Sequence, residues 1–282
     1  MVAAWAVDEH TIEAASQAVD LGFIKAVLVG DAALINDVCV KRGIDAAKFT
    51  IVDNPDELKA VAQAVQMVHD GEGDVLMKGL CSTDKFLRAI LNKETGLLPP
   101  KGLLSHVGVI DSPNYHKLIF LTDMAVVPLP DLRQKMKLTN YIVKVAKSFG
   151  IAKPKVAFVA ASEQVLDSMP ACMEAAALAK MVERGQIKGC IADGPLALDV
   201  AIDKESVEIK KLVSLVAGDA DCLVFPNIES ANVFWKTNSK LSTGVRQAGM
   251  LVGTTAPCIL ASRADSVDTK LNSIAEAVMS VL

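Results

Sequence analysis

The sequence predicts an α/β fold with mostly parallel sheets and helices on both faces. Short apolar runs rich in valine alternate with helical stretches of about ten to fifteen residues, which is typical of a helix-covered parallel sheet. The composition is 51% hydrophobic but only 4% aromatic, which suits closely packed helices and strands. At roughly 150 residues per domain, the 282 residues indicate about two domains.

The first half of the chain supplies five predicted strands and three helices. Strands are expected at 25–31, 49–53, 74–79, 106–113 and 116–126, the last two joined by a turn. One helix is expected over 32–42, one from an Asn54 cap to about Gly71, and one over 82–93 with Ser82 or Thr83 as its cap. The apolar residues of the second helix share one face: Leu58, Val61, Val65 and Val68.

The second half repeats the alternation. Strands are expected at 155–161, 189–195, 221–227 and 250–262. Helices are expected at about 170–184, 204–217 and 230–248, and a last helix follows Ser266. The amphipathic stretch 131–150, which ends at Gly150 shortly before Pro154, is the best junction between two domains.

Composition excludes several classes of protein. The net charge is −4 and no run of Lys or Arg reaches five, so no nucleic-acid partner is expected. No apolar run reaches the ~18 residues of a membrane span. The N-terminus meets Asp8 and Glu9 early and has no basic segment, which argues against a secretory signal. The six scattered cysteines lack a C-x-x-C pair and are interpreted as reduced core residues of a cytoplasmic protein.

Common catalytic motifs are missing from the sequence. There is no G-x-G-x-x-G for a dinucleotide, no P-loop, no G-x-S-x-G and no H-E-x-x-H. The four histidines show no ligand spacing, so no metal centre is expected.

The informative residues are the polar ones that follow strands, because ligands bind at the carboxyl ends of parallel strands. Five strand ends carry such residues. Those selected as candidate substrate-binding residues are Lys78, Ser82, Thr83, Asp193, Asp199, Asn232, Lys236 and Ser266. Lys78-Gly79 and Asp193-Gly194-Pro195 are also ordinary turn sequences, so each has a purely structural interpretation.

The stretch "APCILASRADSVDTK" (256–270) holds the strongest candidate. A buried strand leads to Ser262 and Arg263, and a helix follows. Hydroxyls and an arginine at a helix N-terminus make an anion site, since the guanidinium fork matches phosphate. The alternative is that Asp265 or Ser266 merely caps the helix and Arg263 is a surface cation.

Several segments together resemble one family, the phosphate acetyl/butyryltransferases. They are "LVGD" (28–31), "MKGLCSTDKFLRA" (77–89), "LTDMAVVPLPDLRQK" (121–135), "DGPLALDVAI" (193–202), "FPNIESANVFWK" (225–236) and "APCILASRADS" (256–266). The resemblance extends over nearly the whole chain in the right order. The short length and the S-R-A-D-S form resemble the butyryl branch more than the acetyl branch.

The resemblance implies a fold like that of the isocitrate and isopropylmalate dehydrogenases. Two α/β domains would flank an active-site cleft. The last segment would return to the first domain, giving 1–136 plus 256–282 and 137–255.

The resemblance also implies the reaction, in which an acyl group moves between coenzyme A and inorganic phosphate by direct attack in a ternary complex. Arg263 would hold phosphate, Ser262 would donate a hydrogen bond near the reacting thiol or oxyanion, and Arg88 would support the anionic substrates. Coenzyme A would be a substrate, and no cofactor would be tightly bound. A homo-oligomer is expected, with an acyl kinase consuming the acyl phosphate.

More than one residue is a candidate for the proton acceptor of the thiol. The acetyl branch has an aspartate seven positions after the serine, where this chain has Thr269. Asp265 is the candidate catalytic carboxylate here, with Asp193 and Asp199 as further options. Asp268 points about 100° away around the helix. A thiol of pKa ~8.5 beside Arg263 and a helix N-terminus would also ionise in part without a base.

Three alternatives stay open at this point. A phosphate acetyltransferase differs only in the acyl group. A metal-dependent decarboxylating dehydrogenase on the same fold would need clustered aspartates and a nucleotide loop. A sensor of coenzyme A or acyl phosphate would need no catalysis. A covalent acyl-enzyme on Cys81 is disfavoured because no histidine lies nearby in sequence to activate the thiol.

Overall fold

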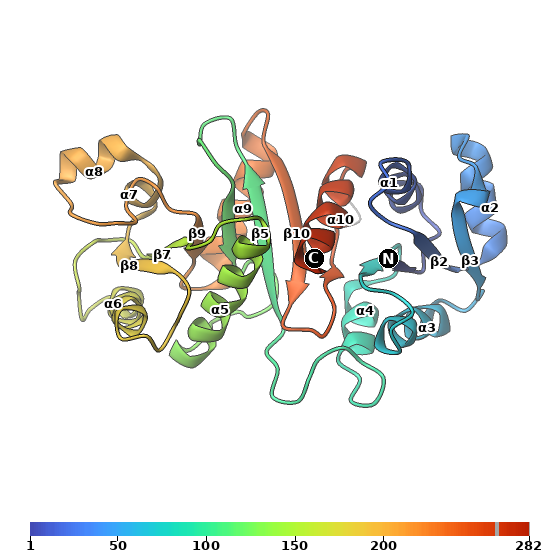
Figure 1. Ribbon diagram of the computed structural model, residues 1–282, viewed down its shortest axis with the longest axis horizontal. Helices are drawn as coiled ribbons and strands as arrows, with labels where there is room; N and C mark the ends of the chain where they lie inside the picture. The colour runs from blue at the N-terminus through green and yellow to red at the C-terminus, as the bar shows by residue number, and fades with distance from the viewer. Residues whose placement is uncertain (263–264, 282) are drawn as a thin grey trace. The chain divides into compact units, whose positions relative to one another are not determined.

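The computed structural model describes every residue of the chain except 263, 264 and 282. The chain divides into two compact units, residues 1–104 with 248–282, and residues 105–247. Each unit is a mixed α/β structure with mostly parallel strands and helices packed on them (Figure 1). The α/β class is thereby confirmed, whereas the predicted domain bounds and the dehydrogenase-like arrangement stay predictions.

The sheet of the first unit runs in the order β3-β2-β1-β4-β11-β10. Its strands are β1 (Val2–Ala4), β2 (Ala26–Gly30), β3 (Phe49–Asp53), β4 (Leu76–Lys78), β11 (Cys258–Ile259) and the end of β10 (Arg246–Val252). All pairs are parallel except β10 with β11. The late strand β11 therefore joins a sheet made by the first hundred residues.

Helices cover both faces of this sheet (Figure 1). One face carries α1 (Glu9–Asp20), α2 (Ala32–Arg42) and α10 (Val267–Val281), and α1 packs against both others. The other face carries α3 (Glu57–His69) and α4 (Thr83–Ile90), while the short 3₁₀ helix η1 (Ala46–Lys48) precedes β3.

Three elements of this unit, β1, α1 and the short η1, were not predicted from the sequence. β1 is only three residues long, yet it lies between β2 and β4 and is completely buried. Its Val-Ala-Ala sequence gives no period from which to recognise a strand. Asp8 starts α1 as its N-cap, accepting a hydrogen bond from the Thr11 N–H at 3.0 Å.

The sheet of the second unit runs in the order β5-β6-β9-β7-β8. Its strands are β5 (Ser105–Asp111), β6 (Ile119–Thr122), β7 (Lys155–Val159), β8 (Ile191–Leu196) and β9 (Cys222–Val224). β5 and β6 form an antiparallel pair across the predicted turn at Ser112, and the remaining pairs are parallel.

Alternate residues along the strands face opposite layers of helices. Phe120 and Phe158 lie toward α5 (Leu132–Ser148) and α6 (Pro170–Glu183). Leu121 and Leu223 lie in a core with α7 (Leu198–Ile202) and α9 (Ile228–Leu241). The short helix α8 (Lys204–Lys210) follows α7 directly.

Three predicted helix boundaries were wrong. The helix expected at Asn54 starts after Asp56, whose carboxylate takes the capping hydrogen bond from the Lys59 N–H at 3.1 Å. The helix expected over 204–217 ends at Lys210, because Lys211 adopts a left-handed conformation with φ 52°. The helix expected over 230–248 ends at Leu241, and Arg246 already begins β10.

All six cysteines are buried and free, as the sequence indicated. No helix of the described residues has the length and apolar character needed to cross a membrane.

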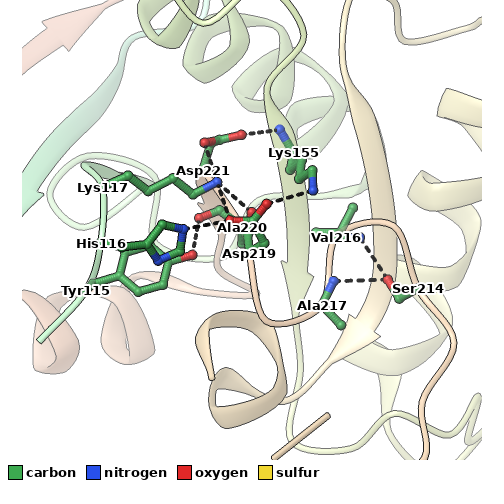
Figure 2. A network of polar contacts seen from close by, with 10 residues as sticks. All are labelled: Tyr115, His116, Lys117, Lys155, Ser214, Val216, Ala217, Asp219, Ala220 and Asp221. Atoms are coloured by element: carbon green, nitrogen blue, oxygen red, sulfur yellow. Dashed lines mark hydrogen bonds and ion pairs between the residues drawn. The ribbon is translucent and has the colours of Figure 1, made fainter. Parts of the chain in front are cut away.

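A network of charges ties together the amino ends of three neighbouring strands in the second unit (Figure 2). Lys117 precedes β6, Lys155 begins β7, and Asp219 and Asp221 precede β9. The Lys155 ammonium is 2.7 Å from Asp219 and the Lys117 ammonium 2.8 Å from Asp221. His116 Nε2 lies 2.8 Å from Asp219, so Lys155 and His116 both contact this carboxylate.

These contacts control the pKa of Asp219. Burial alone would raise it, but hydrogen bonds from Lys155, Lys117 and His116 outweigh burial and hold the pKa well below its usual range. A lowered pKa means that the contribution to stability is complete above the unfolded value of about 3.9. It is lost as the pH falls further.

We expect Asp219→Asn to lower the free energy of unfolding by about 1–2 kcal/mol at pH 7, because it removes the negative charge and one of the two acceptor oxygens that the network shares. Denaturant unfolding at several pH values measures this. The difference from wild type should shrink below pH ~3.9. Glu183→Gln, which breaks an exposed pair with Lys180, is the control and should leave the stability indistinguishable from wild type. An Asp219→Asn difference that stays constant down to pH 2 contradicts the account.

Glu276 of α10 carries a buried carboxyl group. It is 2% exposed, and neither carboxyl oxygen has a hydrogen-bond partner among the described residues. Burial raises the pKa of Glu276 well above its ordinary value. The folded state thus holds this proton more tightly than the unfolded state, and the stability falls as the pH rises above about 4.3.

We expect Glu276→Met, which is close in volume and apolar, to raise the free energy of unfolding by about 1–3 kcal/mol at pH 8. The gain should diminish toward pH 4, where the carboxyl is protonated in both states. Unfolding curves of the two proteins at pH 4, 6 and 8 measure it. Parallel pH dependences would show that the Glu276 carboxyl does not titrate differently on folding.

Candidate functional site

Two chain segments far apart in sequence meet at one edge of the first unit's sheet. β4 and β11 are parallel neighbours, with Met77 paired to Ile259. Their carboxyl ends therefore lie side by side, and the loop after Lys78 comes next to the segment that leads to Ser262. This is the sheet edge at which ligands of parallel α/β proteins bind.

The loop after β4 is folded around the side chain of Lys78. This lysine is 2% exposed, and its ammonium donates hydrogen bonds to the carbonyls of Gly79 at 2.9 Å and Cys81 at 3.0 Å. At Gly79 any side chain is excluded, since a Cβ would lie 2.3 Å from the Trp5 carbonyl oxygen. Lys78, predicted to bind substrate, thus shapes the loop.

Ser82 and Thr83 start α4 beside this loop. The Ser82 hydroxyl accepts a hydrogen bond from the Lys85 N–H at 3.3 Å, which makes Ser82 the N-cap as expected. Arg88 lies in the last turn of the same helix. Its guanidinium is 3.1 Å from Asp84, and both side chains are largely exposed.

Two hydrogen bonds join Ser262 to Asp265, and this pair of contacts defines the Ser262 turn. The Ser262 N–H donates to the Asp265 carboxylate at 2.6 Å, and the Asp265 N–H donates to the Ser262 carbonyl at 3.2 Å. Asp265, the candidate catalytic carboxylate, therefore also fixes the turn. Ser262 itself is exposed. Arg263, the predicted phosphate ligand, lies outside the described residues.

Ser266 caps the helix that follows. Its hydroxyl accepts the Thr269 N–H at 3.2 Å and lies 3.1 Å from the Thr269 hydroxyl. Thr269, the position at which the acetyl branch has its aspartate, is thus engaged with the cap of α10. The helix start, with its free N–H groups and positive dipole end, directly follows the Ser262 turn.

The other candidates belong to the second unit. On α9 the Asn232 side chain donates a hydrogen bond to the Met124 carbonyl at 2.9 Å, and Lys236 lies one turn further on, exposed. The loop that Asn232 supports follows β6. Asp123 organises it by accepting the N–H groups of Ala125, Val126 and Val127 at 2.8–3.1 Å.

The two carboxylates of "DGPLALD", Asp193 and Asp199, make different contacts. Asp193 is within β8 and accepts the Gly194 N–H at 2.8 Å. Asp199 is at the start of α7, and its carboxylate is 2.9 Å from the exposed Lys210 ammonium. The hydrogen bond from Lys210 lowers the pKa of Asp199. No described residues form a group of three or more His, Cys, Asp or Glu side chains that could hold a metal ion.

Comparison with known proteins shows the family of this chain. A family model described as phosphate acetyl/butaryl transferase matches residues 57–278. The chain belongs to this family. It is 46% identical to the phosphate butyryltransferase of Clostridium acetobutylicum over 96% of this chain and 90% of the relative. It is 39% identical to the phosphate acetyltransferase of Rhizobium meliloti over 96% and 85%.

A solved structure agrees with this placement. The structure of a branched-chain phosphotransacylase from Enterococcus faecalis V583 matches 99% of this chain and 98% of its own, with a TM-score of 0.87 and 27% identity. The resemblance recognised in the sequence is therefore confirmed, and the chain is an acyltransferase of the phosphate acetyl/butyryl transferase family.

Sequence reasoning missed two residues at this sheet edge, Asp8 and Lys270. Both line a small open pocket together with Glu9, His10, Gly79 and Leu80. Asp8 could have been recognised as a helix cap. Lys270 carried a weaker signal, namely a cation in the first turn of a helix, where the dipole disfavours it.

We expect Thr269→Val to leave the rate and its pH dependence nearly unchanged in the transferase. Valine keeps the shape of Thr269 and removes only the hydroxyl contact with Ser266, while the capping N–H bond persists. The measurement is the pH–rate profile of acyl transfer, with kcat within about threefold of wild type. A loss of a hundredfold or more, or a displaced acid limb, would assign the base role to Thr269.

Proposed function

We propose that the protein transfers a short-chain acyl group, butyryl or a close homologue, between coenzyme A and inorganic phosphate. The observation that carries this is the 46% identity with a phosphate butyryltransferase over 96% of the chain. It is supported by the position of Ser262 and Asp265, which directly precede the N-terminus of α10, where an anion is favoured.

The proposed reaction is acyl-CoA plus phosphate giving acyl phosphate plus coenzyme A. A phosphate oxygen attacks the thioester carbon, the C–O bond forms, and the C–S bond breaks after a tetrahedral intermediate. The sulfur leaves as a thiolate or takes a proton. In the reverse direction the thiolate attacks the acyl phosphate carbon and phosphate leaves.

Three residues carry the proposed chemistry. Arg263 holds two phosphate oxygens, and Ser262 donates its hydroxyl to the developing oxyanion or to the sulfur. Asp265 fixes the Ser262 backbone with one carboxylate oxygen. Its other oxygen is the candidate proton acceptor, and the field of Arg263 and the helix N-terminus favours the thiolate in any case.

The remaining candidates are proposed as substrate-binding residues, and their proposed roles differ. Lys78, Ser82 and Thr83 shape the loop beside Ser262, and Ser266 caps the phosphate-facing helix. Asn232 holds the loop after β6. The other residues that we propose to contact the substrates are Arg88, Asp193, Asp199 and Lys236.

We also propose the setting of the reaction. The enzyme is cytoplasmic and homo-oligomeric, coenzyme A is a substrate rather than a resident cofactor, and an acyl kinase uses the acyl phosphate. The dehydrogenase-like two-domain arrangement, 1–136 with 256–282 and 137–255, is proposed on the same grounds.

A thiol-release assay with acyl-CoA and phosphate tests the function. Phosphate- or arsenate-dependent release of coenzyme A is expected, and a series from acetyl- to hexanoyl-CoA defines the acyl group. Acetyl-CoA as the best substrate would favour the acetyl branch, which the Rhizobium meliloti relative represents. No release, or metal-dependent NAD(P) reduction instead, would overturn the proposal.

We expect Arg263→Ala to raise the KM for phosphate and lower kcat, with kcat/KM for phosphate reduced about 10²–10³-fold, because a charge-assisted contact to the reacting anion is lost. Arg263→Lys keeps the charge without the fork and should recover part of the loss. The exposed Arg184 is the control, and Arg184→Ala should match wild type. An unchanged phosphate dependence in Arg263→Ala would remove Arg263 from the site.

A further inference from the structure

Lys270 is the feature of the first unit that the proposed reaction leaves unexplained. It lies in the first turn of α10 and is 2% exposed. A cation is unfavourable at a helix N-terminus and costly to bury without a partner. Its ammonium forms no ion pair with a described residue. A buried lysine in this position therefore needs another reason.

The lysine reaches back from the helix to the turn that carries Ser262. Its ammonium donates a hydrogen bond to the Ser262 carbonyl at 3.4 Å. The same carbonyl accepts the Asp265 N–H at 3.2 Å. The carbonyl of Ser262 thus has two donors, one from the turn itself and one from α10.

Two carboxylates face this ammonium from different elements. Asp8 comes from the N-cap of α1 and Asp265 from the turn, and both favour the charged form of Lys270. Asp8 uses one oxygen on the Thr11 N–H, while its other oxygen is buried without a described hydrogen-bond partner. Burial nevertheless prevails and lowers the pKa of Lys270.

The lysine also has access to solvent through a pocket. Asp8, Glu9, His10, Gly79, Leu80 and Lys270 line it, at the carboxyl ends of β1 and β4. The buried ammonium therefore sits between this pocket and the backbone of an exposed serine.

We propose that Lys270 is a positioning residue, which holds the Ser262 carbonyl so that the serine hydroxyl keeps its orientation at the start of α10. The role in catalysis rests on the proposed function; the hold on the turn does not. Ser262 is exposed, and the Lys270 ammonium is a donor to its carbonyl from outside the turn.

Two substitutions separate the hydrogen bond from the packing. Lys270→Met fills the same space without a donor, and Lys270→Gln keeps an N–H donor without the charge. The control is Lys135→Met, since Lys135 is another buried lysine, 4% exposed and paired with Glu174 in the second unit. A merely structural lysine would lose stability and activity together.

Lys270→Met should stay folded, because methionine fills the space of the buried stem. Its kcat/KM for phosphate should fall about 10–100-fold, and amide exchange across 262–266 should become faster. Lys270→Gln should stay within about fivefold of wild type in both. Lys135→Met should lower Tm but leave exchange at 262–266 unchanged.

Three results overturn the proposal. They are unchanged exchange at 262–266 in Lys270→Met, a Lys270→Gln variant as impaired as Lys270→Met, and wild-type turnover in Lys270→Met. Should Lys270→Met not fold, the exchange and rate of Lys270→Gln decide the matter. If wild type itself shows no phosphate-dependent release of coenzyme A, the proposed function fails, and amide exchange alone still decides whether Lys270 holds the turn.

Discussion

The parallel pairing of β11 with β4 is the constraint on which the site of this protein depends. β11 is only two residues long, yet Cys258 and Ile259 are completely buried and paired with Leu76 and Met77. The Leu76 N–H donates to the Pro257 carbonyl at 3.0 Å, and the Thr255 N–H to the Leu97 carbonyl at 2.8 Å. These contacts fix where the chain leaves the sheet, and therefore where Ser262 and α10 begin.

The sheet of the second unit has different contacts at the two ends of its strands. The charge network of Lys117, Lys155 and Asp219 lies at the amino ends of its strands. The loop organised by Asp123 and supported by Asn232 follows the carboxyl end of β6. The carboxyl ends of parallel strands are where ligands of α/β proteins bind.

The sequence was sufficient wherever a local pattern determines structure. Helical period, caps such as Ser82, and the turn at Ser112 identified most elements. β1 was not predicted because its three small residues show no hydrophobic period and are buried only by pairing with other strands. The site residues after β4 and β11 followed from strand ends. The use of Lys78 on its own loop did not, because a side chain's direction depends on the fold.

The two buried ionisable groups of α10 show why burial alone does not indicate a role. Lys270 and Glu276 are each 2% exposed and lie on one helix, about 9 Å apart along its axis. Glu276 has no hydrogen-bond partner in the described structure, so its carboxyl can stay protonated and only reduces stability. Lys270 faces two carboxylates and donates to the backbone of Ser262. An uncompensated group can be replaced by an apolar one without loss, whereas Lys270 supplies a contact that no apolar residue can provide at the turn. The directed hydrogen bond, rather than the burial, is what links Lys270 of α10 to the backbone of Ser262.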